Sequence, residues 1–110
     1  MLVFVGGYTT ADRNGHAEGI TAFAMDTESG TWRPLGVVAR VPNPSFLALD
    51  PACRRLYCVH GAGFSEVSAF AIDDLDTGAL KELGRQPSGG TNPVHLEVHP
   101  DGRWLVVANY

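Results

Sequence analysis

Short apolar segments rich in Val, Leu, Phe and Tyr recur along the whole chain, and Gly, Pro, Asn or Asp bound each of them. This pattern predicts β-strands, because no window shows the 3.6-residue period of an amphipathic helix. The expected strands cover residues 2–8, 19–25, 33–40, 44–49, 55–60, 66–72, 79–86, 93–98 and 103–110. The chain is therefore predicted to be all-β.

The apolar segments repeat in order. Residues 43–51 (NPSFLALDP) align with residues 92–100 (NPVHLEVHP), which begin 49 residues later, and residues 20–26 (ITAFAMD) align with residues 67–73 (VSAFAID), 47 residues later. Each repeat contains four such segments, which predicts a unit of four strands. A four-stranded unit of about 40 to 50 residues is the size of a β-propeller blade.

The repeat predicts a β-propeller of four-stranded antiparallel blades, with one complete blade and two partial blades. Residues 1–41 are expected to form a blade that lacks its inner strand, residues 42–87 a complete blade, and residues 88–110 the first two strands of the next blade. In a closed ring, the inner strand of the first blade can come from the far end of a longer chain. We therefore expect this sequence to be the opening part of such a ring.

Several motifs carry a resemblance to a known family. In order along the chain they are VFVGGYT at residues 3–9, NPSFL at 43–47, GGTNPVH at 89–95, PDGR at 100–103 and VANY at 107–110. Their order and spacing resemble the N-terminal part of the seven-bladed lactonase family, which contains bacterial 6-phosphogluconolactonases and a carboxy-muconate lactonizing enzyme. The family's usual Gly-Thr-Tyr is Gly6-Gly7-Tyr8 here.

The resemblance implies a hydrolase that opens a sugar-derived lactone, such as 6-phosphogluconolactone, without a cofactor. Seven blades of about 48 residues need roughly 340 residues, so the His- and Arg-bearing segments of later blades lie outside these 110 residues. The 110-residue chain alone is expected to lack useful activity and to self-associate through exposed blade faces. A non-catalytic binding scaffold and a lactonizing isomerase remain as alternatives.

His95 is the candidate general base, because it lies in the Pro93-Val94-His95 segment that resembles the family's Pro-x-His at the head of an inner strand. Strand alternation puts Glu97, a weaker candidate, on the same face as His95, with Cα atoms about 6.5 to 7 Å apart. Lactone hydrolysis needs a base for water and a donor or cation for the developing oxyanion. An arginine of a later blade is the expected stabiliser.

A second interpretation of His95 and Glu97 stays open. The preceding repeat has Phe46 and Ala48 at the two equivalent positions, so the site tolerates apolar side chains. On that basis the two residues are polar lining of a channel, without contact to substrate.

Metal and cofactor sites are not predicted. His95, Glu97 and His99 alternate on one strand, but residues four apart on a strand are about 13 Å apart, too far to share one ion. Residues 88–91 (SGGT) lead into a strand and lack the Lys of a phosphate-binding loop. His60 ends a predicted strand, so it either borders the mouth of a channel or, as the favoured interpretation, owes its polarity to the turn that follows.

Charge and composition argue against two classes of partner, nucleic acid and membranes. The net charge is −4, and the 8 basic residues are scattered, which argues against nucleic acid. No apolar run reaches the roughly 18 residues of a membrane span, and no cationic segment precedes the apolar start, so we expect no membrane association and a cytoplasmic location. Cys53 and Cys58 are expected to be free thiols.

Overall fold

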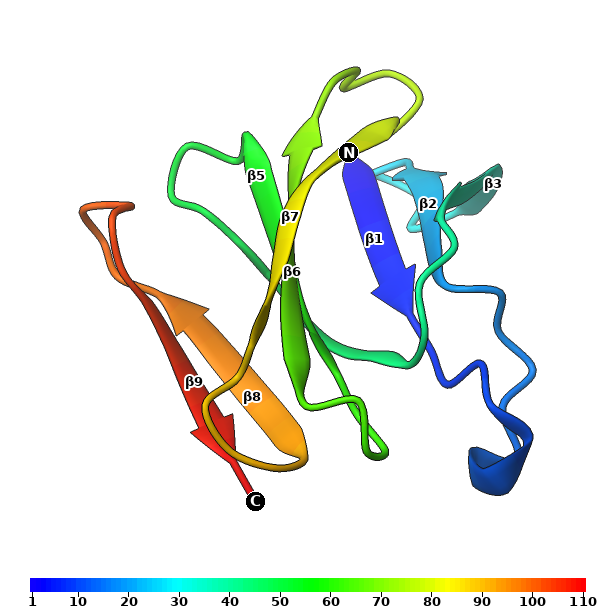
Figure 1. Cartoon of the computed structure of the whole chain (residues 1–110). Helices are drawn as coiled ribbons and strands as arrows, with labels where there is room; N and C mark the ends of the chain where they lie inside the picture. The colour runs from blue at the N-terminus through cyan, green and yellow to red at the C-terminus, as the bar shows by residue number, and fades with distance from the viewer.

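Three antiparallel sheets follow one another along the chain in this computed structural model, which describes residues 1–110 (Figure 1). The first sheet contains β1 (Leu2–Gly6), β2 (Ile20–Met25) and β3 (Trp32–Ala39). The second contains β4 (Pro44–Leu49), β5 (Arg55–His60), β6 (Glu66–Ile72) and β7 (Leu80–Pro87), and the third contains β8 (Pro93–Val98) and β9 (Leu105–Asn109). One short 3-10 helix, η1 (Ala11–Arg13), lies between β1 and β2.

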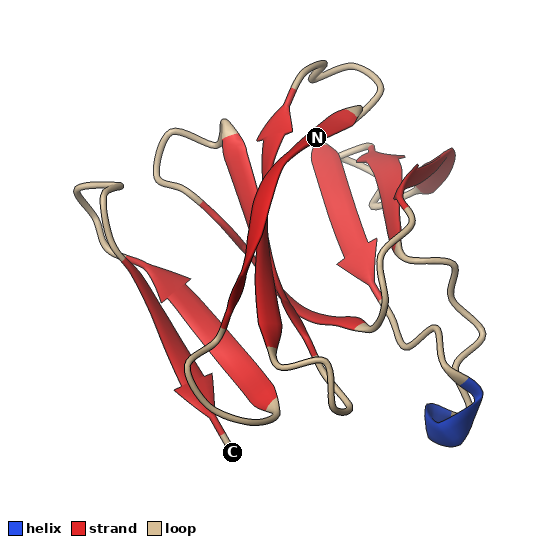
Figure 2. Cartoon of the chain, viewed as in Figure 1, coloured by secondary structure: helices blue, strands red, loops and turns tan.

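The all-β prediction is confirmed, with one complete four-stranded blade and two partial blades (Figure 2). The predicted bounds of β4, β5, β6 and β8 agree with the structure, whereas β9 begins at Leu105 instead of at residue 103. The reason is local, because the amide of Arg103 donates to the Asp101 side chain at 2.9 Å and so belongs to the turn. No helix is long and apolar enough to span a membrane.

A β-bulge lies at the head of both β4 and β8. In β4 the register passes from Pro44 opposite His60 to Phe46 opposite Val59, and β8 repeats the same irregularity between Pro93 and His95. Each bulge inserts one residue, which re-aims the side chains at the strand head. Strict alternation, which would put Val94 on the buried face with Leu96, therefore holds only from His95 onward, and Val94 is 45% exposed.

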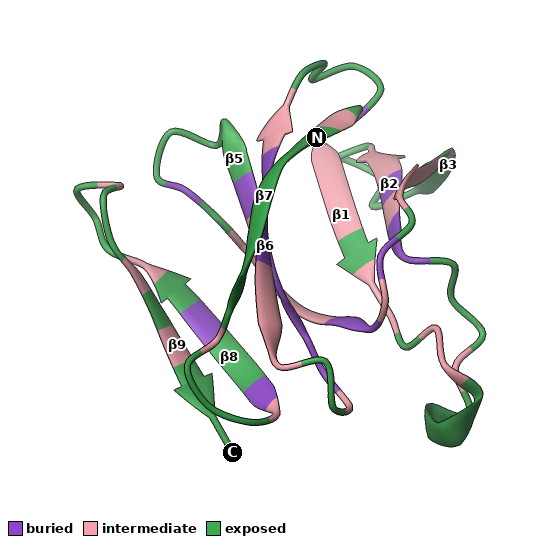
Figure 3. Cartoon of the chain, in the orientation of Figure 1, coloured by how far each residue is buried: buried purple, intermediate pink, exposed green.

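The core lies between the first and second sheets. Its buried cluster is formed by Ile20, Val41, Leu56, Cys58 and Phe70. In the third sheet, Leu96 is the buried apolar side chain of β8 and is 1% exposed, because β8 packs against β4 and β5. Figure 3 shows this buried stretch of β8. The second and third sheets thus bury apolar side chains by facing the sheet that precedes them.

Four connections meet at one end of the three sheets, the lower edge in Figure 1. They are the β1–β2 and β5–β6 loops and the crossovers from β3 to β4 and from β7 to β8. The inner strands β4 and β8 begin at this end, and β9 ends there. Residues at the heads of the inner strands are therefore neighbours of loops that come from the preceding sheet.

Candidate functional site

Asn43 joins three segments at the head of β4. Its backbone has a φ of 41°, and the whole residue is buried. The side-chain oxygen accepts hydrogen bonds from the amides of Thr9 and Thr10 at 2.8 and 3.1 Å. The side-chain amide donates to the carbonyl oxygen of Gly61 at 3.4 Å. A single carboxamide therefore fixes the β1–β2 loop and the β5–β6 loop against the start of an inner strand.

His95 stacks on Phe46, its counterpart in the preceding repeat. The ring centroids are 4.5 Å apart, with the planes inclined by 54°. His95 is exposed apart from this contact, whereas its neighbour Leu96 is buried. The stack supports one side of the imidazole and leaves its nitrogens without a partner in the chain, so they are accessible to solvent or ligand.

Glu97 lies two residues further along β8, opposite Val106 of β9. It is exposed, as the alternation of β8 requires, and it shares a face with His95. Neither residue forms an ion pair or hydrogen bond with the other or with a third side chain. The structure thus brings the two sequence candidates to one face without yet joining them.

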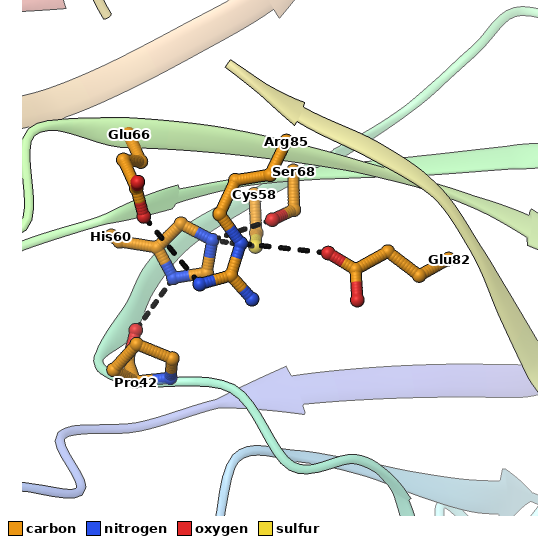
Figure 4. Close-up of polar contacts among 7 residues, drawn as sticks. All are labelled: Pro42, Cys58, His60, Glu66, Ser68, Glu82 and Arg85. Atoms are coloured by element: carbon orange, nitrogen blue, oxygen red, sulfur yellow. Dashed lines mark hydrogen bonds and ion pairs between the residues drawn. The ribbon is translucent and has the colours of Figure 1, made fainter. Parts of the chain in front are cut away.

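His60 is fully buried, so the polarity of a turn does not explain it, and the sequence interpretation of this residue was wrong. Its Nδ1 donates to the carbonyl oxygen of Pro42 at 2.6 Å, and its Nε2 then accepts from the hydroxyl of Ser68 at 2.7 Å (Figure 4). This arrangement fixes a neutral imidazole between the β3–β4 crossover and β6. Burial lowers the pKa of His60 below its ordinary value of 6.5.

Cys58 lies beside this pair, with its Sγ 3.7 Å from Nε2 of His60. Burial raises the pKa of the Cys58 thiol to about 12, which keeps it protonated and unreactive. Cys53 is exposed in the turn before β5, and both cysteines are free thiols, as predicted. The Ser68–His60 pair has no solvent-exposed atoms to present to a substrate, so its role is structural.

Arg85 of β7 makes two ion pairs next to His60. Its guanidinium lies 3.4 Å from the Glu66 carboxylate and 3.5 Å from the Glu82 carboxylate (Figure 4). All three side chains are partly exposed, which limits each pair to about 1 kcal/mol or less. The pair with Glu66 joins β7 to β6, whereas Glu82 lies on β7 itself.

The acidic and imidazole side chains of β8 do not come together at one point where they could bind a metal ion. Nδ1 of His99 lies 3.1 Å from Asp101 within the β8–β9 turn, at the other end of the strand from the head that carries His95. The chain contains no group of three or more His, Cys, Asp or Glu residues placed to hold an ion.

Comparison with known proteins decides the family. The profile of the family described as "Lactonase, 7-bladed beta-propeller" matches residues 2–110. This chain belongs to that lactonase family. The family prediction made from the motifs is thereby confirmed.

Individual relatives of the chain support the same family assignment. The chain is 36% identical to a 6-phosphogluconolactonase of Formosa agariphila, over 98% of this chain and 30% of the relative. It is 32% identical to a 6-phosphogluconolactonase of Bacillus subtilis, over 97% of this chain and 30% of the relative. The chain therefore spans about a third of the length of the curated relatives it matches.

Solved structures of lactonase type superimpose closely on the chain. The periplasmic gluconolactonase of Pseudomonas aeruginosa matches with a TM-score of 0.83 and 31% identity, over 99% of this chain and 30% of that one. A Bacteroides fragilis protein, provisionally assigned as a 6-phosphogluconolactonase, matches with a TM-score of 0.85 and 34% identity, over 99% of this chain and 29% of that one.

Two features of this lactonase-family chain were missed from the sequence. The first is the side-chain role of Asn43, for which the repeated Asn-Pro at residues 43–44 and 92–93 was an available signal. The second is the His60–Ser68 pair, which has no comparable signal. Those two residues lie on different strands, and only the register of β5 with β6 brings them together.

Proposed function

We propose that the protein is a lactone hydrolase whose substrate is a sugar-derived lactone, 6-phosphogluconolactone being the first choice. The family match over residues 2–110 supports the reaction class, and the names of the two curated relatives support the substrate. We further propose that the three sheets are successive blades with boundaries after residues 41 and 87, in a seven-bladed ring.

The observation that carries the mechanism is the exposed imidazole of His95, held against Phe46 at the head of an inner strand. In the proposed reaction, His95 takes a proton from water as the water oxygen attacks the lactone carbonyl carbon. The ring carbon–oxygen bond then breaks, and the imidazolium returns the proton to the departing ring oxygen. The products are the open hydroxy acid and neutral His95.

Glu97 contributes by its charge in this proposal. A carboxylate on the same face as His95 favours the imidazolium that forms during attack, because opposite charges stabilise one another. The developing oxyanion needs a cation or hydrogen-bond donor, which we assign to an arginine of another blade. The proposed reaction uses no metal or cofactor.

We propose a cytoplasmic location for the protein. The proposal follows from the proposed substrate, the phosphorylated lactone for which the two curated relatives are named. The Pseudomonas aeruginosa relative is named as periplasmic, so fractionation of the source cells is the appropriate test.

The test of function uses the protein encoded by the complete reading frame. We expect it to hydrolyse 6-phosphogluconolactone well above the spontaneous rate. His95→Phe places in β8 the residue that the repeat has in β4, and it keeps an aromatic ring against Phe46. We expect it to lower kcat by about 100-fold or more and to leave Tm unchanged.

Two outcomes would refute this assignment. Absence of turnover by the complete wild-type protein would exclude the hydrolase and favour a binding scaffold. Full turnover by His95→Phe would exclude His95 as the base while leaving the reaction class intact.

A further inference from the structure

Phe46 and His95 occupy the same position in two successive repeats, and the structure places their rings in contact. Phe46 lies on β4 and His95 on β8, and β4 packs directly against β8. The ring centroids are 4.5 Å apart, with the planes inclined by 54°. This is an ordinary geometry for a pair of aromatic rings. The contact therefore joins the inner strands of two neighbouring sheets.

The β-bulges at the heads of β4 and β8 bring these two side chains together. In β4 the register shift lies between Pro44 and Phe46, and in β8 it lies between Pro93 and His95. A bulge re-aims the side chain that follows it. Because the two bulges are equivalent, Phe46 and His95 leave their strands at equivalent points, and the packing of β8 on β4 sets one ring beside the other.

Phe46 lies on the face of β4 that is turned away from the core. Its neighbour Leu47 packs against the buried cluster between the first and second sheets. Phe46 is only partly buried and is not part of that cluster or of the side chains packed against it. The ring at residue 46 therefore serves the contact with His95 more than it serves the core.

We propose that Phe46 is a positioning residue for His95, an inference that rests on the proposed function. A general base must keep one ring nitrogen within hydrogen-bond reach of the water that it activates. A side chain on the surface of a strand can otherwise rotate between several rotamers. The phenyl ring lies against one side of the imidazole and restricts this rotation. It competes for neither ring nitrogen, because a phenyl group has no hydrogen-bond donor or acceptor.

The experiment measures hydrolysis of 6-phosphogluconolactone by variants of the protein encoded by the complete reading frame. Phe46→Leu keeps a large apolar side chain but removes the flat ring. We expect its kcat to fall by about 10- to 100-fold, the effect of a misplaced catalytic group. Its KM should stay close to that of wild type, and its Tm should fall only slightly, because Phe46 lies outside the core. Phe46→Tyr keeps the ring and should keep kcat close to the wild-type value.

The matched control is Leu47→Ala, on the opposite face of the same strand. This variant removes side-chain atoms that pack against the core, so it should lower Tm more than Phe46→Leu does. Assayed well below its Tm, it should leave kcat unchanged. A residue that only stabilised the fold would change Tm without this separation of kcat from KM.

Failure of this inference is distinguishable from failure of the proposed function. Full turnover by Phe46→Leu, or a raised KM at unchanged kcat, would overturn the inference and leave the hydrolase intact. The inference is also wrong if Leu47→Ala or Phe46→Tyr loses as much kcat as Phe46→Leu, since the flat ring would not be the cause. A wild-type protein without turnover, or a fully active His95→Phe, would refute the proposed base and this inference together.

Discussion

The hydroxyl of Ser68 donates to Nε2 of His60 at 2.7 Å while the opposite ring nitrogen donates to Pro42, so His60 is held in its neutral form inside the second sheet. Protonation of Nε2 would turn it from an acceptor into a donor and break the bond as it stands. Burial also disfavours the imidazolium, and it outweighs the bond to Pro42, which acts in the opposite direction on the pKa.

This buried pair predicts that stability falls on acidification. The folded pKa of His60 lies below its ordinary value of 6.5, so the unfolded chain binds a proton first as pH falls. The stabilisation is present above about pH 6.5 and is lost as pH falls toward the folded pKa. Denaturant unfolding at a series of pH values between 7.5 and 5 measures the effect.

The matched variant for the pH experiment is His60→Asn, because Asn109 is the residue at the equivalent position in the third sheet. Asparagine does not titrate, so the variant should be less stable at pH 7.5 but should lose less stability on acidification. If the two proteins show the same dependence on pH, then His60 is not the group responsible.

Gly6 marks a close approach of the first sheet to the second. A Cβ atom at this position would overlap the carbonyl oxygen of Pro44, which belongs to backbone and cannot move aside alone. We expect Gly6→Ala to reduce the free energy of unfolding by about 1–3 kcal/mol, as overpacking does in cores. Denaturant unfolding is the measurement.

The control for Gly6 is Gly84→Ala in β7. A Cβ atom there meets no atom within 4 Å, and the backbone φ is not positive, so the substitution should be nearly neutral. Equal effects of the two alanines would show that the approach of Gly6 to Pro44 is not tight.

The outer face of the third sheet predicts self-association of the 110-residue chain. Trp104 and Val106 are 67% and 66% exposed, and β9 has a free edge that pairs with no other strand. Exposed apolar side chains beside an open edge favour pairing between copies. We expect light scattering coupled to size-exclusion chromatography to show dimers or larger species at micromolar concentration.

A double variant separates this surface from other causes of association. Trp104→Lys with Val106→Lys places charges on the same face and should shift the chain toward monomer. Wild-type chain that elutes as a monomer at all concentrations would contradict the prediction.

The repeat in the sequence determined the strand order and the bounds of β4, β5, β6 and β8, and the motifs indicated the family. Apolar side chains at fixed spacing must face a neighbouring sheet, and that requirement repeats with each blade, so residues 43–51 and 92–100 give equivalent strands. His95 and Glu97 could be assigned to one face for the same reason, since alternation along a strand is local geometry.

Tertiary structure alone decided which polar side chains form hydrogen bonds with distant segments of the chain. Asn43 and Asn92 both precede a proline, yet only the side chain of Asn43 accepts hydrogen bonds from two backbone amides. His60 is buried because the β3–β4 crossover and Ser68 close around it. Such contacts join segments distant in the chain, and their geometry depends on the register and loops of neighbouring sheets, which no local pattern of residues encodes.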